Sequence, residues 1–165
     1  MATRAKRSAA PVQHPGVLLR IPPPVWLLGS LIVAWVIHYF FATPVIVRSL
    51  PAGIVLIVAG IAVAMWGGAT FSRAGTELHP TSPANAKLVT NGPFRYTRNP
   101  MYSGVMLVSL GVALIFGTVP FFVMSVLLFL LVNSVFIPYE EAKMERQYGA
   151  QFRAYKTRVR RWGIL

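Results

Sequence analysis

Four apolar runs occupy nearly half of this 165-residue chain and constrain its fold more than any other feature. They extend over about 25–42, 50–71, 101–116 and 119–138. A helix needs roughly 20 residues, with a range of about 17 to 25, to cross the hydrocarbon core of a bilayer. Only 12% of the residues are charged, against roughly 25% in soluble domains. We therefore expect an all-α integral membrane protein with about four transmembrane helices.

The last two runs are separated by a very short turn, Gly117-Thr118-Val119-Pro120. A turn of this length predicts a tight helical hairpin, because antiparallel helices can be joined by only a few residues. The third run is the shortest of the four. From the sequence, it either crosses the bilayer or ends within it, and both possibilities stay open.

The basic residues are distributed unevenly between the two sides that this topology creates. The chain carries 16 Lys and Arg residues against four acidic ones, and only Arg48 falls between the first two apolar runs. Cytoplasmic loops of membrane proteins carry an excess of Lys and Arg. We therefore expect both termini in the cytosol, which requires an even number of spans, and we favour a bacterial inner membrane over the endoplasmic reticulum. The apolar content assigns the basic excess to a membrane surface and not to nucleic acid.

The predicted membrane domain comprises residues 25–165. Two further segments lie outside its apolar runs, one before the domain and one at its C-terminal end. Residues 1–24 form a basic, Pro-rich cytosolic tail. Near the other end, apolar side chains recur at spacings of three and four between Met144 and Val159, with basic residues around them. This pattern is typical of one helix face. It predicts an amphipathic helix over 140–161 that lies on the cytosolic leaflet and is broken or bent at Gly149.

Residues capable of chemistry gather in the loop 72–100 and at Glu140-Glu141. The predicted topology brings both to the cytosolic face. Each also has a structural interpretation, since Asn99 and Pro100 suit the start of a helix and the two Glu residues can pair with nearby basic side chains. The chain has no Cys, which excludes thiolate chemistry. Because Glu77 and His79 are too few ligands for a typical zinc site, we expect no metal.

Two motifs in this region resemble a known family. The segment LVTNGPFRYTRNPMYSG is followed, after the hairpin, by EEAKMERQYGAQFRAYKTRVRRW. Together they resemble the membrane methyltransferases of the isoprenylcysteine carboxyl methyltransferase family and the related phospholipid N-methyltransferases, over roughly residues 79–162. The resemblance implies S-adenosylmethionine as methyl donor and a lipid-like or hydrophobic acceptor. It places cofactor contacts on His79, Ala86, Lys87, Leu88, Val89, Phe94, Asn99, Pro100, Met101, Tyr102 and Glu140, with Arg98 and Glu141 as the catalytic motif residues.

The chain departs from the family pattern at four positions. Asn99 replaces the usual His, as in the phospholipid enzymes, and Phe94 replaces a Tyr. His79 stands where the animal enzyme has Gln. Phe136 occupies the substrate-binding position where the animal carboxyl methyltransferases have an Arg. Because an Arg fork suits a carboxylate, its loss argues against a prenylcysteine carboxylate as substrate.

The residues suggest roles that the resemblance alone does not assign. We expect Glu140 to bind a polar or cationic part of the cofactor, with Tyr102 and Phe94 near the adenine or the sulfonium. Arg98 either holds the cofactor carboxylate or orients Glu141, which is the best candidate base if the nucleophile is an amine. Thioether lipids, phospholipid amines and small hydrophobic molecules remain open as acceptors, and so does the oligomeric state.

Two alternatives keep the fold and change the function. One is an NADPH-dependent reductase of the membrane sterol-reductase type, whose C-terminal motif is similar. The other is a membrane scaffold or lipid-binding protein without catalysis. Both are analogies at the level of the fold, and cofactor binding distinguishes them from a methyltransferase.

Overall fold

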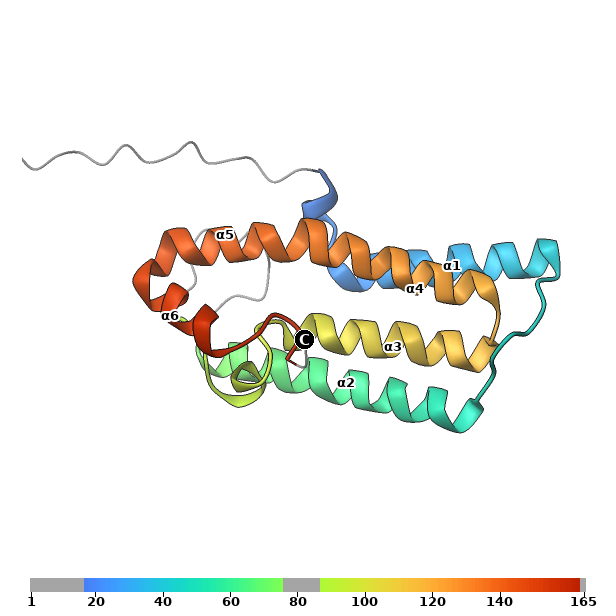
Figure 1. The fold of residues 1–165 in the computed structure, drawn as a ribbon, viewed down its shortest axis with the longest axis horizontal. Helices are drawn as coiled ribbons and strands as arrows, with labels where there is room; N and C mark the ends of the chain where they lie inside the picture. Colours follow the sequence, from blue (N-terminus) through green and yellow to red (C-terminus); the bar gives the residue numbers. More distant parts are fainter. Residues whose placement is uncertain (1–16, 76–86, 164–165) are drawn as a thin grey trace, which may run out of the picture.

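The computed structural model describes residues 17–75 and 87–163, and this part of the chain is helical without a β-sheet (Figure 1). The predicted all-α membrane fold is confirmed. Three helices are long and apolar enough to span a membrane, namely Pro23–Phe41, Leu50–Arg73 and Val119–Tyr148. The elements in chain order are η1 Val17–Arg20, α1 Pro23–Phe41, α2 Leu50–Arg73, η2 Gly92–Arg95, α3 Pro100–Phe116, α4 Val119–Leu131, the π-helical turn η3 Val132–Phe136, α5 Ile137–Tyr148 and α6 Ala150–Arg158.

Helix α3 has 17 residues and packs closely along α2 (Figure 1). Gly53, Gly60 and Gly67 of α2 recur at intervals of seven, and all three are buried. A Cβ atom at Gly60 would lie 2.6 Å from the carbonyl oxygen of Gly104 in α3. One at Gly53 would lie 2.7 Å from that of Gly111. Small residues let membrane helices approach closely, so α3 extends between the same two ends of the bundle as α2.

The turn between α3 and α4 is held by the loop that joins α1 to α2. Gly117 ends α3 with a φ of 74°, a left-handed conformation that favours glycine. Its carbonyl oxygen accepts hydrogen bonds from the backbone N–H groups of Ile46 at 2.7 Å and Val47 at 3.2 Å. The predicted hairpin of the last two membrane helices is present, and this loop fixes its turn at the end of the bundle that also carries Arg48.

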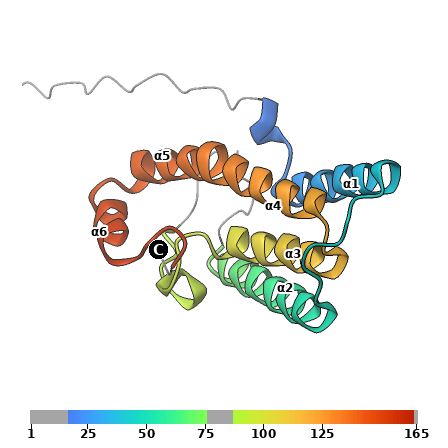
Figure 2. The same cartoon turned by 45° about the vertical axis from the view of Figure 1, so that its right-hand side comes forward.

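The last membrane helix is longer than predicted, and the predicted helix over 140–161 is wrong in its bounds. α4, η3 and α5 form one continuous helix, Val119–Tyr148, so Pro138 does not end the membrane helix. Gly149, with a φ of 51°, then turns the chain, and only α6 is separate (Figure 2). Phe152 and Tyr155 of α6 are buried within the protein. An apolar helix face packs against a protein loop as well as against a lipid surface, so its periodicity did not distinguish the two.

The end of the bundle opposite Arg48 brings together segments from all parts of the chain. Leu19 of η1 is buried against a core that contains Tyr102 and Phe136. The loop before α3 and the residues after α6 bond to each other at the same end, since the backbone N–H of Arg98 donates to the carbonyl oxygen of Arg160 at 3.0 Å. The candidate functional site lies at this end.

The packing of α2 on α3 yields a first prediction. Gly60→Ala places a methyl group against the Gly104 carbonyl oxygen, and we expect a loss of about 1–3 kcal/mol of unfolding free energy, which is typical of overpacking. Gly68→Ala is the matched control, because a Cβ there meets nothing within 4 Å. Denaturation of the purified protein in detergent, followed by circular dichroism, measures both. Equal stability of the two variants would contradict the packing described.

Candidate active site

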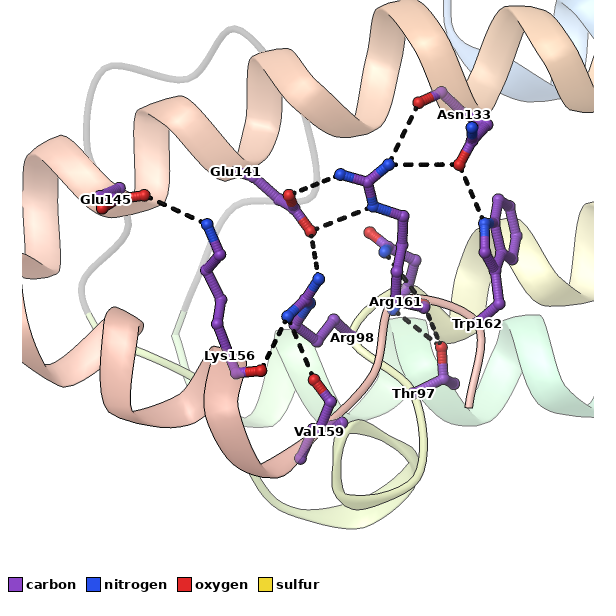
Figure 3. A network of polar contacts seen from close by, with 10 residues as sticks. Thr97, Arg98, Asn133, Glu141, Glu145, Lys156, Val159, Arg161 and Trp162 are labelled. Atoms are coloured by element: carbon purple, nitrogen blue, oxygen red, sulfur yellow. Dashed lines mark hydrogen bonds and ion pairs between the residues drawn. The ribbon is translucent and has the colours of Figure 1, made fainter. Parts of the chain in front are cut away.

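The carboxylate of Glu141 holds three segments of the chain together (Figure 3). Its Oε1 lies 2.9 Å from Nη2 of Arg98, in the loop before α3. Its Oε2 lies 2.8 Å from Nη2 of Arg161, beyond α6. The side chains of Glu141 and Arg98 are only 13% and 12% exposed, so water screens this ion pair weakly.

Arg98 also ties its loop to the end of α6. Its Nη1 donates to the carbonyl oxygens of Lys156 and Val159, each at 3.2 Å. These carbonyls belong to the last turn of α6 and its exit, where helix carbonyls lack partners within the helix. One guanidinium therefore satisfies the end of α6 and the charge of Glu141 together. Its Nε is buried and makes no hydrogen bond within the described part of the protein.

Residues 159–163 form a non-helical C-terminal strap between the loop and the last membrane helix (Figure 3). On one side, the carbonyl oxygen of Arg161 accepts hydrogen bonds from Thr97 Oγ1 at 2.7 Å and Asn99 Nδ2 at 3.2 Å. On the other, Trp162 Nε1 and Arg161 Nη1 donate to Oδ1 of Asn133, at 3.0 and 3.3 Å. Asn133 lies in the π-helical turn, a feature that is frequent at functional sites.

Aromatic side chains attach α6 to the loop as well. The hydroxyl of Tyr155 donates to the carbonyl oxygen of Phe94 at 2.7 Å. Burial raises the pKa of Tyr155 above its usual value, which keeps the hydroxyl protonated as a donor. The Phe94 ring in turn packs on Phe71 of α2, with ring centroids 4.9 Å apart.

Tyr102 and Glu140 form a second polar pair, which lines the same cavity as Arg98 and Glu141. The hydroxyl of Tyr102 donates to Oε1 of Glu140 at 2.7 Å. The Tyr102 ring is buried and meets Phe136 edge to face, with centroids 6.3 Å apart. Phe136, predicted to contact substrate, is fully buried in the core and lines neither of the two cavities beside this pair. Its position indicates that it supports Tyr102 by packing.

Two cavities adjoin each other at Tyr102 and Glu140. The first, of about 70 Å³, lies between the loop, α3, α5 and α6. The second, of about 550 Å³, lies between α2, α3 and the chain that enters α1. Met101, Tyr102 and Glu140 line both cavities. The first is lined by Phe71, Lys87, Leu88, Val89, Phe94, Arg98, Asn99, Pro100, Met101, Tyr102, Glu140, Glu141, Met144, Phe152 and Tyr155.

Most of the residues singled out in the sequence lie around the first cavity. These are Lys87, Leu88, Val89, Phe94, Arg98, Asn99, Pro100, Met101, Tyr102, Glu140 and Glu141. His79 and Ala86 lie outside the described residues. Asn99 and Pro100 do begin α3, yet the Asn99 side chain bonds to the strap and does not cap the helix.

Sequence reasoning missed Arg161, Trp162 and the anchoring role of Asn133. Asn133 is a polar residue inside an apolar run, and Arg161 and Trp162 end the second motif, but neither pattern indicates which residues they contact. Sequence reasoning also missed Pro22, Pro23 and Pro24, which line the second cavity. These residues come from the N-terminal tail, whose position relative to the loop no local pattern indicates.

Comparison with known protein families gives one match. The family described as phospholipid methyltransferase matches residues 49–151, which is more than half of the chain. The matched region contains α2, the loop before α3, the hairpin and both Glu residues. The resemblance seen in the sequence motifs is thereby confirmed. No curated protein and no solved structure matches the chain.

The Glu141 ion pairs yield a second prediction. Glu141→Gln leaves two arginines facing a neutral amide, and we expect a loss of about 3 kcal/mol of unfolding free energy, as for other buried pairs that lose one partner. Glu145→Gln is the control, because Glu145 also pairs with two cations but is 38% exposed, and we expect it to cost about 1 kcal/mol or less. Chemical denaturation measures both, and equal losses would refute the anchoring role of Glu141.

Proposed function

Because the chain belongs to the phospholipid methyltransferase family, we propose that it transfers a methyl group from S-adenosylmethionine to a hydrophobic or lipid-like acceptor at the cytosolic face of a membrane. The observation that carries the proposal is the pair of adjoining cavities that share Tyr102 and Glu140. A transferase must bring two molecules into contact, and these two side chains lie at the boundary where contact would occur.

The walls of the first cavity fit the parts of S-adenosylmethionine. Phe71, Phe94 and Phe152 offer aromatic faces, which stack on an adenine and attract a cationic sulfur. The buried Nε of Arg98 lacks a partner among the described residues, and it can donate a charge-assisted hydrogen bond to a carboxylate. Once bound, the cofactor supplies a methyl group that its positive sulfur has already activated.

Binding of the whole cofactor requires the first cavity to widen. Its volume of about 70 Å³ is smaller than the roughly 300–1,000 Å³ of most ligand sites. Met101 and Met144 lie in its walls. Methionine side chains are flexible and adapt to irregular spaces, so we propose that these two move when the cofactor enters.

Arg98 and Glu141 act mainly by holding the site together. Both oxygens of Glu141 lie within 2.9 Å of an arginine nitrogen, so the carboxylate is already engaged by two cations. Glu140 lines both cavities, and we assign to it the base function for an acceptor that must lose a proton. Tyr102 orients that carboxylate through its hydrogen bond.

The protein mainly aligns its two substrates and excludes water. Alignment alone supplies up to about 7–11 kcal/mol in well-oriented systems. The second cavity is lined largely by apolar residues of the membrane-spanning helix α2 and its neighbour α3. An apolar acceptor can therefore reach Tyr102 and Glu140 from the bilayer, while a water-soluble cofactor enters from the aqueous side.

The charge distribution supports a site on the cytosolic face of the membrane, which we propose is a bacterial inner membrane. Arg48 lies at the end of the bundle that holds the α3–α4 turn. Arg20, Arg73 and the basic residues of α6 flank the opposite end, with the candidate site. By the positive-inside rule, we propose that the site and both termini face the cytosol.

Cofactor binding gives the third prediction. We expect calorimetry on detergent-solubilised protein to detect micromolar binding of S-adenosylmethionine and of its demethylated product. Phe94→Ala should weaken both by about 1–2 kcal/mol through the loss of an aromatic wall. Ser125→Ala is the control, because its hydroxyl bonds to Ser109 and lines neither cavity. Binding of NADPH without S-adenosylmethionine would instead indicate a reductase. If neither these two ligands nor the demethylated product binds, a scaffold function is favoured.

Orientation gives the fourth prediction. Since the chain has no Cys, a single introduced cysteine reports its own location. A membrane-impermeant maleimide should label Arg48→Cys in intact bacteria and Arg158→Cys only in inverted vesicles, because both positions are exposed but flank opposite ends of the bundle. The reverse labelling pattern would place the site outside the cytosol.

A further inference from the structure

The second cavity offers a ligand one charge in an otherwise apolar space. Its volume of about 550 Å³ lies within the range of small-molecule sites. Its walls are Pro22, Pro23, Pro24, Ala64, Met65, Gly68, Met101, Tyr102, Val105 and Glu140. Among these residues the carboxylate of Glu140 is the single charged group, and the hydroxyl of Tyr102 is the other polar side chain. No Lys or Arg of the described chain is part of this wall.

From this wall we infer that the acceptor is an apolar amine without a phosphate group, bound as its ammonium form against Glu140; the inference rests on the proposed function. An ion in an apolar cavity needs a partner of opposite charge, because loss of hydration costs several kcal/mol otherwise. Glu140 supplies that partner for a cation. A carboxylate acceptor would meet a like charge there and is excluded.

The same wall disfavours a phospholipid amine. In an ethanolamine headgroup only a short linker separates the amine from the phosphate, so an amine that reaches Glu140 draws the phosphate into the cavity. Proteins hold phosphate oxygens with Arg, Lys or backbone N–H groups. Lys87 and Arg98 line the first cavity, and Arg98 is already bonded to Glu141 and α6. Lys143, which acts electrostatically on Glu140, is not part of the wall of the second cavity.

Glu140 is also placed to accept the proton that an ammonium group must lose before its nitrogen can attack. The ammonium transfers a proton to the Glu140 carboxylate and becomes a neutral amine with a free electron pair. That pair forms the nitrogen–carbon bond to the methyl group, while the carbon–sulfur bond breaks and leaves its electrons on sulfur. The positive charge passes from sulfur to nitrogen, and Glu140, on both cavities, lies beside the charge before and after transfer.

The test compares water-soluble probes of one chain length on the full-length protein in amphipol. Calorimetric titration with hexylamine, hexanol, hexanoate and dihexanoyl phosphatidylethanolamine needs no cofactor and no turnover. We expect hexylamine to bind about tenfold more tightly than hexanol, as one charge-assisted hydrogen bond provides. Hexanoate and the phospholipid should bind more weakly than hexanol.

Three variants locate the binding. Glu140→Gln should abolish the preference for hexylamine while hexanol binds as before. Gly68→Phe should weaken hexylamine and hexanol alike, because a side chain there projects into open space in the second cavity. Gly29→Phe is the matched control, since Gly29 is equally open but lines a separate groove between α1 and α4, and it should bind both probes as the parent protein does.

Two results would overturn the inference: hexanoate or the phospholipid binding as tightly as hexylamine, or a preference for hexylamine that survives Glu140→Gln. The proposed function is tested apart from this, by titration of the demethylated cofactor product into the same preparation. Amine binding without product binding refutes the methyltransferase and keeps the amine site. Product binding without amine preference keeps the methyltransferase and refutes the acceptor class.

Discussion

The double ion pair of Glu141 is the interaction on which the rest of the site depends. A carboxylate removed from water is costly unless its partners replace hydration, and here Arg98 and Arg161 occupy both oxygens. Successive residues of a helix project roughly 100° apart. With Glu141 held toward the strap, Glu140 is directed to Tyr102 and the two cavities. The ion pairs of Glu141 thus set the direction in which Glu140 points, toward Tyr102.

The membrane helices provide a rigid frame for that arrangement. Glycines at intervals of seven bring α2 against α3, and this fixes the start of α3, where Asn99, Pro100 and Tyr102 lie. The π-helical turn immediately precedes α5 and carries Asn133, whose side chain receives Arg161 and Trp162. An irregular turn within an apolar helix therefore becomes an attachment point for the end of the chain.

The sequence predicted the features that local patterns determine, and it failed where distant contacts decide. The apolar runs and the start of α3 at Asn99-Pro100 could be predicted, because helix length and the preference of proline for the first helical turn follow from neighbouring residues. The fourth apolar run ends at Pro138, yet the helix continues to Tyr148. Proline cannot donate within the helical ladder, and the π-helical turn η3 lies directly before this part of the helix. The partnership of Arg161 with Asn133 was unreadable, because 28 residues and the fold of the loop separate them.

Phe136 bears on the class of acceptor both through its place in the sequence and through its contacts in the structure. In the sequence, a Phe where the animal carboxyl methyltransferases have an Arg already argued against a carboxylate substrate. In the structure, the Phe136 ring supports Tyr102 from the core, and the cavity beside Tyr102 contains a carboxylate and no cation among its walls. The missing Arg and the charge of Glu140 are independent features of this chain. Since neither feature offers an anion a cationic partner, both agree with the proposed acceptor, an apolar cation.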